Sequence, residues 1–250
     1  MPSSRTAEAL ILRTYKLGEA DRIVVFLTKD RGKRRGVAKG ARRVRSRFLG
    51  SLEPLTLGRV RYFEHEQREL VRIDEIEVIR SPLSGASGAA LGHVGYFAEL
   101  LDEWAPEASP NEKLFRLGAS VVGAVTEGVG AERLARYFEY WLLRLEGLYP
   151  SLSACAICAA RFDEDGAVVA TRDRVFVCAR CGRSVGPTGG RLSAEALAYL
   201  RAAGRRQPRS LDELALTAGA ARELEVAHHA LIAAHLEKEL KSARVLREMR

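Results

Sequence analysis

The four cysteines of this chain have the spacing of a metal site. They form two CxxC pairs, Cys155 with Cys158 and Cys178 with Cys181, with nineteen residues between the pairs. Each CxxC turn presents two sulfurs to one ion, and a hairpin between the turns brings the second pair back to the first. Four thiolates complete the tetrahedron that zinc prefers and leave no position for a reactive water. The spacing therefore predicts one structural zinc per chain.

Two other uses of the cysteines stay open at this point. Disulfides form in oxidising compartments, but the opening MPSSRTAEALILR has too short an apolar stretch for a signal peptide, so we expect a cytoplasmic protein. A redox-active pair would leave the second CxxC without a role. Arg180 and Arg183 lie beside the second pair, so the cysteine segment is also a candidate binding surface.

A dense cationic run is the second chemical feature. Ten basic residues and one acid, Asp30, lie between Lys29 and Arg47. Residues 1–80 hold nineteen basic and eleven acidic residues, whereas residues 81–250 hold twenty-one of each, so the first third carries the whole net charge of +8. A phosphate backbone would relieve the mutual repulsion of these cations. Nucleic acid is therefore the leading partner, ahead of an anionic membrane surface or a solubilising face without a target.

Candidate contacts follow from this run. Phe48 directly follows the last cations, and we expect it to be exposed, where it can stack on an unpaired base. The predicted nucleic-acid contacts are Lys33, Arg34, Arg35, Lys39, Arg42, Arg43, Arg45, Arg47 and Phe48. No membrane span is expected, because the longest uncharged run, residues 81–98, is interrupted by four glycines.

The elements that position these residues change type near residue 80. Short β-branched and alternating runs predict five strands, at residues 8–15, 22–28, 36–39, 55–63 and 70–79. Five short strands separated by glycine turns suggest a small barrel, for which an OB-fold and an SH3-like barrel fit almost equally well. We assign residues 1–80 to this domain.

Helical periodicity dominates residues 81–250, which we assign to a second, helical domain. Apolar residues at three- and four-residue spacing predict helices at 89–104, 112–126, 131–148, 193–203, 211–217 and 220–250. The cysteine segment interrupts them at about residues 150–190, with strand-like runs at 167–171 and 175–178. The fold class is therefore α+β, with a barrel followed by helices and an inserted zinc segment.

Motifs for nucleotide hydrolysis or acyl transfer are missing from the sequence. No GxxxxGK[ST] phosphate loop, GxGxxG turn, GxSxG elbow or HExxH pair occurs. An enzyme acting on nucleic acid would have to use unspecific carboxylates such as Asp163, Glu164 and Asp165, which we expect in an exposed turn. We therefore predict a protein that is not an enzyme.

Several segments resemble a known family. The stretches YKLGEADRIVVFLT (15–28), VAKGARR (37–43), SRFLGSLEP (46–54), GLYPSLSACAIC (147–158) and LEKELKSARVL (236–246) are similar to the bacterial RecO family of DNA repair proteins. The resemblance spans nearly the whole chain in order. It implies an OB-fold, a helical domain with a zinc insertion, and a DNA-facing barrel that includes Lys39, Arg42, Arg43 and Arg47; a role for the Arg34–Arg35 pair rests on charge alone.

The resemblance also implies a function. It indicates a recombination mediator that binds single- and double-stranded DNA and anneals complementary strands. Such a protein helps to load RecA onto strands coated by single-stranded DNA-binding protein, with RecR as a partner. A zinc-stabilised module that binds RNA or serves transcription is the alternative, because the same barrel and charge suit RNA.

Overall fold

The computed structural model describes residues 3–65, 67–84, 88–162, 164–186 and 188–248. Its contacts divide the chain into two compact units. The barrel unit comprises Met1–Gly128 with Ser242–Arg250, and the cysteine unit comprises Val129–Lys241. Strands give way to helices between Arg80 and Pro82, close to the boundary predicted at residue 80, but the first two helices pack within the barrel unit.

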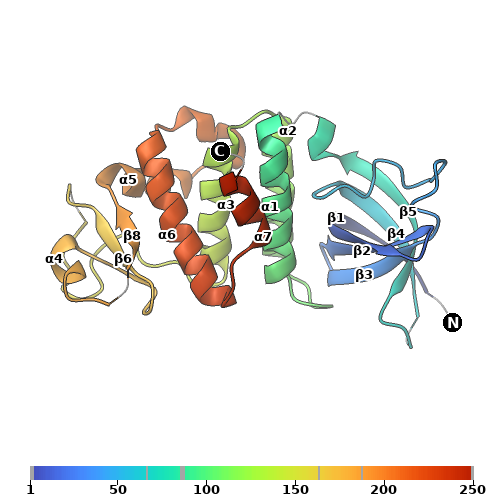
Figure 1. Ribbon diagram of the computed structural model, residues 1–250, viewed down its shortest axis with the longest axis horizontal. Coiled ribbons are helices and arrows are strands. Elements are labelled where there is room, and N and C mark those ends of the chain that lie inside the picture. The colour runs from blue at the N-terminus through green and yellow to red at the C-terminus, as the bar shows by residue number, and fades with distance from the viewer. Residues whose placement is uncertain (1–2, 66, 85–87, 163, 187, 249–250) are drawn as a thin grey trace. The chain divides into compact units, whose positions relative to one another are not determined.

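Five strands close the barrel in the order β1-β2-β3-β5-β4 (Figure 1). They are β1 (Ser3–Leu17), β2 (Asp21–Thr28), β3 (Gly32–Ala38), β4 (Leu57–Glu64) and β5 (Val71–Arg80). Neighbours are antiparallel except β3 and β5, and β1 also pairs with β4. This closed five-stranded order is that of the OB-fold, which decides between the two barrels that the sequence allowed.

Alternation along the strands separates two apolar layers. Inward residues such as Ala9, Ile11, Val24 and Phe26 fill the barrel together with Tyr62. Outward residues on β1 and β2 are apolar as well, because the helices α1 (Gly88–Trp104) and α2 (Glu112–Thr126) pack against these strands. The helix α7 (Lys241–Glu248) belongs to the same unit from Ser242 onward, and the backbone N–H of Ser242 donates to the Glu99 carboxylate at 2.7 Å.

The loop between β3 and β4, residues 39–56, closes one end of the barrel. Phe48 and Leu52 point into the core and are 2% and 9% exposed. Backbone N–H groups of Gly40 and Arg42 donate to the Asp21 carboxylate and the Ala20 carbonyl. The loop is therefore fixed to the β1–β2 turn at one side and to the core at the other.

The cysteine unit combines helices with a small sheet. Its sheet has the order β7-β6-β8, from β6 (Ala167–Ala170), β7 (Val175–Val177) and β8 (Thr188–Leu192). Its helices are α3 (Ala131–Leu145), α4 (Ala179–Gly182), α5 (Ala194–Ala203) and α6 (Ala218–Leu236), with a 3-10 segment, η2 (Pro208–Glu213). Among the described residues, no helix is long and apolar enough to cross a membrane.

A charged network joins α3 to α6 inside this unit. The imidazole of His228, which is fully buried, has its Nδ1 2.9 Å from the Glu139 carboxylate and its Nε2 2.8 Å from the Tyr149 hydroxyl. A carboxylate only accepts, so Nδ1 carries the proton and Nε2 accepts from Tyr149. Arg136 pairs with the other oxygen of Glu139 at 2.9 Å. The Glu139 carboxylate is thus held by a guanidinium from its own helix and by an imidazole from α6.

Several predicted elements need correction. The helix predicted at 211–217 is the shorter η2, which begins at Pro208. The helix predicted at 220–250 is two helices, because Glu237 adopts the left-handed conformation (φ 54°) that ends α6. The helix predicted to reach 148 ends at Leu145, before the positive φ of Gly147. The strand β8 was not predicted, because its sequence TGGRL carries two glycines and little β-propensity.

Candidate functional site

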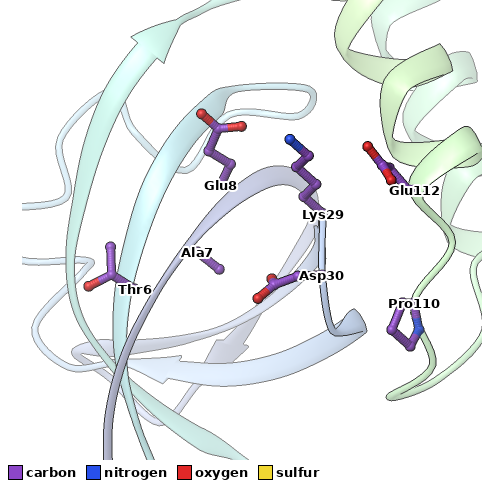
Figure 2. A pocket seen from close by; sticks show the side chains of 7 residues that line it. All are labelled: Thr6, Ala7, Glu8, Lys29, Asp30, Pro110 and Glu112. Atoms are coloured by element: carbon purple, nitrogen blue, oxygen red, sulfur yellow. The ribbon is translucent and has the colours of Figure 1, made fainter.

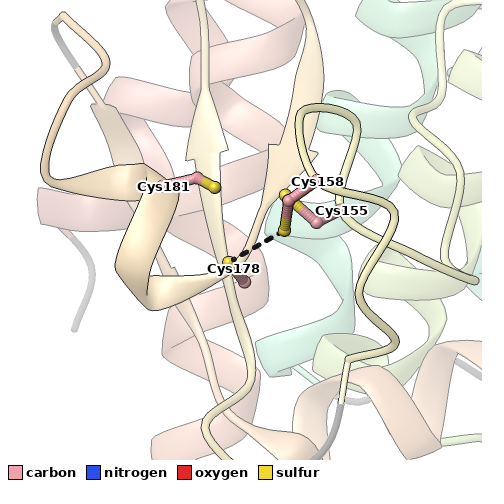
Figure 3. A group of neighbouring side chains, drawn as sticks. All are labelled: Cys155, Cys158, Cys178 and Cys181. Atoms are coloured by element: carbon pink, nitrogen blue, oxygen red, sulfur yellow. Dashed lines mark hydrogen bonds between the residues drawn. The ribbon is translucent and has the colours of Figure 1, made fainter.

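Two tight turns bring the four cysteine sulfurs together (Figure 3). In the first turn the N–H of Cys155 donates to the Ala160 carbonyl, and Ala159 returns a bond to the Cys155 carbonyl. The second turn is α4, whose N-cap is Cys178. The N–H of Ala156 donates to Phe176 of β7, so the strand that leads into the second turn also holds the first.

The distances between the sulfurs suit a tetrahedral ion. All four sulfurs lie within 4.8 Å of one another, and the Sγ atoms of Cys158 and Cys178 are 3.8 Å apart. Zinc–sulfur bonds of about 2.3 Å give a tetrahedron whose edge is about 3.8 Å. The cysteines are free thiols, not disulfides. The four predicted ligands therefore form a possible metal site, and their donor set fits zinc.

The protonation of the thiols supports the same use. Burial raises the pKa of Cys155, but backbone N–H groups of Cys158, Cys178 and Ile157 outweigh burial and lower it to about 6. Burial and the other three cysteines raise the pKa of Cys181 to about 12. Four thiolates cannot share this space without a cation, and a bound metal supplies that charge.

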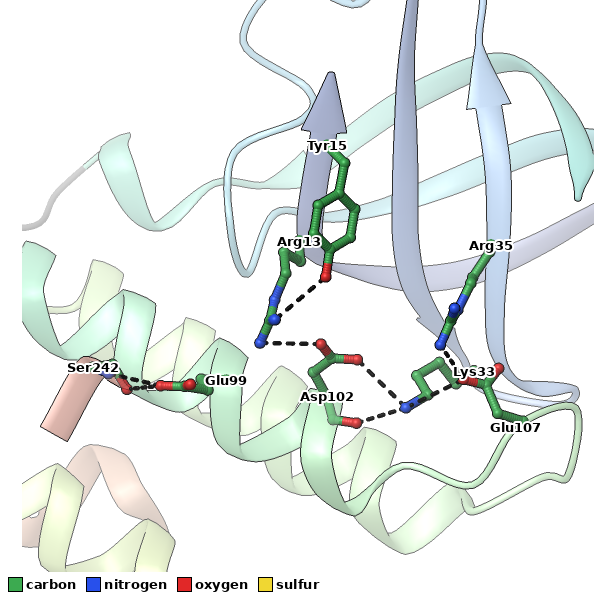
Figure 4. Close-up of polar contacts among 8 residues, drawn as sticks. All are labelled: Arg13, Tyr15, Lys33, Arg35, Glu99, Asp102, Glu107 and Ser242. Carbon is green, nitrogen blue, oxygen red and sulfur yellow. Dashed lines mark hydrogen bonds and ion pairs between the residues drawn. The ribbon is translucent and has the colours of Figure 1, made fainter. Parts of the chain in front are cut away.

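Three predicted nucleic-acid contacts on β3 are already paired with carboxylates, and Figure 4 shows two of them, Lys33 and Arg35. Lys33 is 9% exposed, and its ammonium lies 3.4 Å from the Asp102 carboxylate and 3.5 Å from Glu107. Arg35 pairs with Glu107 at 3.0 Å and Arg34 with Glu64 at 3.4 Å. Lys33 and Arg35 connect β3 to α1 and the segment after it, whereas Arg34 pairs with β4 inside the barrel, so each of the three cations has a carboxylate partner.

Most cations of the β3–β4 loop differ from those of β3 in their pairing with carboxylates. Lys39, Arg42, Arg43 and Arg45 are exposed, and none has a carboxylate partner in the described part of the chain. The guanidinium of Arg42 donates to the Gly18 carbonyl at 3.0 Å, which leaves its charge unbalanced. Arg47 is an intermediate case, because it lies 3.8 Å from the Asp74 carboxylate. The structure therefore concentrates unbalanced positive charge on this loop.

The prediction that Phe48 is exposed is wrong. Its side chain is 2% exposed and fills the end of the barrel, with the Arg47 guanidinium 5.0 Å above the ring. A small barrel has few residues with which to close its ends, and the only aromatic residue of the loop serves that purpose. Phe48 is therefore a core residue that anchors the loop.

One cation that sequence reasoning missed extends the same surface. Lys16 is exposed at the end of β1, opposite Arg22 on β2, next to the turn that the loop contacts. It lies outside the dense cationic run, two residues before Gly18, whose carbonyl accepts from Arg42. The alternation of apolar and polar residues along β1 is visible in the sequence, but it does not show which loop lies beside the end of the strand.

A pocket elsewhere in the barrel unit carries the opposite charge (Figure 2). It encloses about 540 Å³ and is lined by Thr6, Ala7, Glu8, Lys29, Asp30, Pro110 and Glu112. Three carboxylates surround a single ammonium there, so the pocket repels a polyanion. Lys29, the first cation of the run, therefore faces a surface that does not suit phosphate. Asp163, one of the three acids considered for catalysis, lies outside the described residues.

Comparison with known proteins gives consistent matches along the chain. The family model "Recombination protein O N terminal" matches residues 1–82, and "Recombination protein O C terminal" matches residues 86–244. A protein of Anaeromyxobacter sp. (strain K) named DNA repair protein RecO is 35% identical over 246 residues, which cover 96% of this chain and 94% of that protein. One of the same name from Geobacter metallireducens is 34% identical over 267 residues, covering 100% and 99%. Another from Koribacter versatilis is 42% identical over 164 residues, covering 64% and 66%.

Proposed function

The chain belongs to the RecO family of DNA repair proteins, and from this premise we propose that it is a non-enzymatic recombination mediator that binds DNA through its β3–β4 loop. One observation carries the proposal. Lys39, Arg42, Arg43 and Arg45 are exposed and lack carboxylate partners among the described residues, whereas the cations of β3 are paired. Cations that no acid balances gain most from releasing the counterions of a phosphate backbone.

We infer the annealing of complementary DNA strands from the same positive charge of the β3–β4 loop. Two complementary strands repel each other, and a cationic loop lowers that repulsion while the bases stay free to pair. The sequence has no phosphate loop to couple the reaction to ATP, so base pairing supplies the free energy. Membership of the family supports cytoplasmic action with RecR and single-stranded DNA-binding protein, and an indirect role in loading RecA.

Zinc in the four-cysteine site is the second part of what we propose. Cys155, Cys158, Cys178 and Cys181 would hold the ion, which supplies folding free energy and no reactive ligand position. The distances between the sulfurs and the absence of disulfides among these cysteines support this assignment.

The experiment compares two triple variants that lose the same charge. If about five loop cations contact a single strand, the logarithm of affinity should fall with the logarithm of salt concentration at a slope of about −3.5. Replacing Lys39, Arg43 and Arg45 by Ala should flatten this slope by about 2. The matched control replaces Arg35, Arg59 and Arg61, which are exposed but paired with carboxylates, and it should change the slope little.

Equal flattening in both variants would show that net charge alone matters and would remove the loop from the site. An unchanged slope in the loop variant would do the same. Tighter binding to RNA than to DNA of the same sequence and length would favour the RNA-binding alternative, because the barrel itself does not exclude contact with a 2′-hydroxyl.

A further inference from the structure

Two apolar side chains of the β3–β4 loop are almost completely exposed. Val44 is 94% exposed and Leu49 is 82% exposed, whereas Ile157, the next large apolar side chain in the described residues, is 60% exposed. A single exposed valine or leucine is ordinary in a soluble protein. These two are distinctive because they lie among the unbalanced cations, with Val44 directly between Arg43 and Arg45.

The loop holds these side chains outward by anchoring their neighbours. Phe48 is buried in the barrel core, whereas the adjacent Leu49 is exposed. The N–H of Leu49 donates to the Ser46 carbonyl, and the hydroxyl of Ser51 donates to the Phe48 carbonyl at 3.0 Å. These bonds fix the turn in which Leu49 is exposed.

The positive charge around Val44 and Leu49 indicates which kind of molecule binds there. The surrounding cations attract a polyanion, and a nucleic acid offers apolar base faces between its phosphates. In a duplex those faces are stacked and paired, so an inserted aliphatic side chain must first separate base steps. In a single strand they are accessible at little cost. The position of Val44 and Leu49 between the cations thus suits bases that are not paired.

We propose that Val44 and Leu49 contact the bases of bound DNA, so that the β3–β4 loop favours single strands over duplex by apolar contact as well as by charge. The inference rests on the proposed function, because it assumes that the loop binds DNA. It adds a source of strand preference that salt does not screen, since burial of apolar surface does not depend on counterion release.

The test replaces both apolar side chains by serine and leaves every cation in place. For Val44→Ser with Leu49→Ser, we expect binding to a single strand of mixed sequence to weaken about tenfold, as partial burial of two aliphatic side chains implies. The salt slope should stay as in the wild type, and affinity for a fully paired duplex should change by less than about twofold. A 2-aminopurine base in the strand should report the lost contact by its fluorescence.

A matched control replaces Ile157 and Val226, which are 60% and 55% exposed in the cysteine unit, by serine. Both double variants should melt like the wild type, because these side chains pack little.

Wild-type affinity in the Val44–Leu49 variant, or equal losses for single strand and duplex, would overturn the inference and leave salt-dependent binding by the wild type intact. Absence of that binding would overturn the proposed function itself. Loss of binding to anionic phospholipid vesicles with unchanged DNA affinity would assign the two side chains to a membrane surface and overturn the inference as well.

Discussion

Phe48 and Leu49 are adjacent in the sequence, yet one fills the barrel and the other is 82% exposed. Residue type does not distinguish them, because both are large and apolar. The difference arises from the course of the loop, which needs an anchor where the barrel is open. Lys33 and Lys39 differ in the same way, since one is buried against Asp102 and the other is exposed.

At this scale the cysteines give the clearest prediction. Cys178→Ser removes one of the four sulfurs of the proposed zinc site but keeps a residue that can cap α4, so the protein should lose its zinc and melt at a lower temperature. DNA affinity should change much less, because the loop cations belong to the barrel unit. Metal analysis, thermal melting and a DNA titration measure the three effects, with Ser184→Ala as a control beside the site. Folded wild-type protein that contains disulfides and no zinc would contradict the assignment.

Among the elements, α3 and α6 depend on a buried charged network. Burial lowers the pKa of His228 and so favours the neutral imidazole in the folded protein. Burial raises the pKa of Glu139, but the Arg136 guanidinium and hydrogen bonds from His228 and His229 outweigh it and hold this pKa well below its usual range. Burial also raises the pKa of Tyr149, so its hydroxyl keeps the proton that it donates.

This network predicts that the folded state weakens in acid. Below about pH 6.5 the unfolded chain takes up a proton at His228 that the folded chain does not, so stability falls as the pH falls. Below about pH 4.3 the unfolded chain also protonates Glu139 before the folded chain does, which adds to the loss. Melting temperatures at pH 7.5 and 5.5 measure the first step.

The matched variants are His228→Gln and His235→Gln. The first removes the buried imidazole and should reduce the difference in melting temperature between the two pH values, although it lowers both temperatures. The second changes an exposed histidine and should leave the difference as it is. A melting temperature that is the same at pH 7.5 and 5.5 in the wild type would show that His228 is not buried as a neutral group.

For the whole molecule, the uneven distribution of charge is the main functional feature. Residues 1–80 carry the net charge of +8, and the rest of the chain is neutral. We expect this asymmetry to draw a polyanion to residues 1–80 and to leave the neutral remainder available for contact with proteins.

We therefore expect the protein to speed the annealing of complementary single strands without ATP, and to do so on strands coated by single-stranded DNA-binding protein. Fluorescence energy transfer between labelled strands measures the rate. The variant lacking Lys39, Arg43 and Arg45 should anneal more slowly, whereas the control lacking Arg35, Arg59 and Arg61 should resemble the wild type. Annealing no faster than without protein would contradict the mediator function, and an absolute requirement for ATP would reveal an unrecognised active site.

Local patterns in the sequence were enough to predict the five strands, most of the helices and the clustering of the four cysteines. Strand alternation, helical periodicity and CxxC spacing are properties of neighbouring residues, so they can be seen without knowing the fold. The strand order, the burial of Phe48 and the pairing of Lys33 with Asp102 depend on residues distant in the sequence. Only the tertiary structure could separate the cations that carboxylates balance from those on the β3–β4 loop, because charge balance is decided by proximity in space.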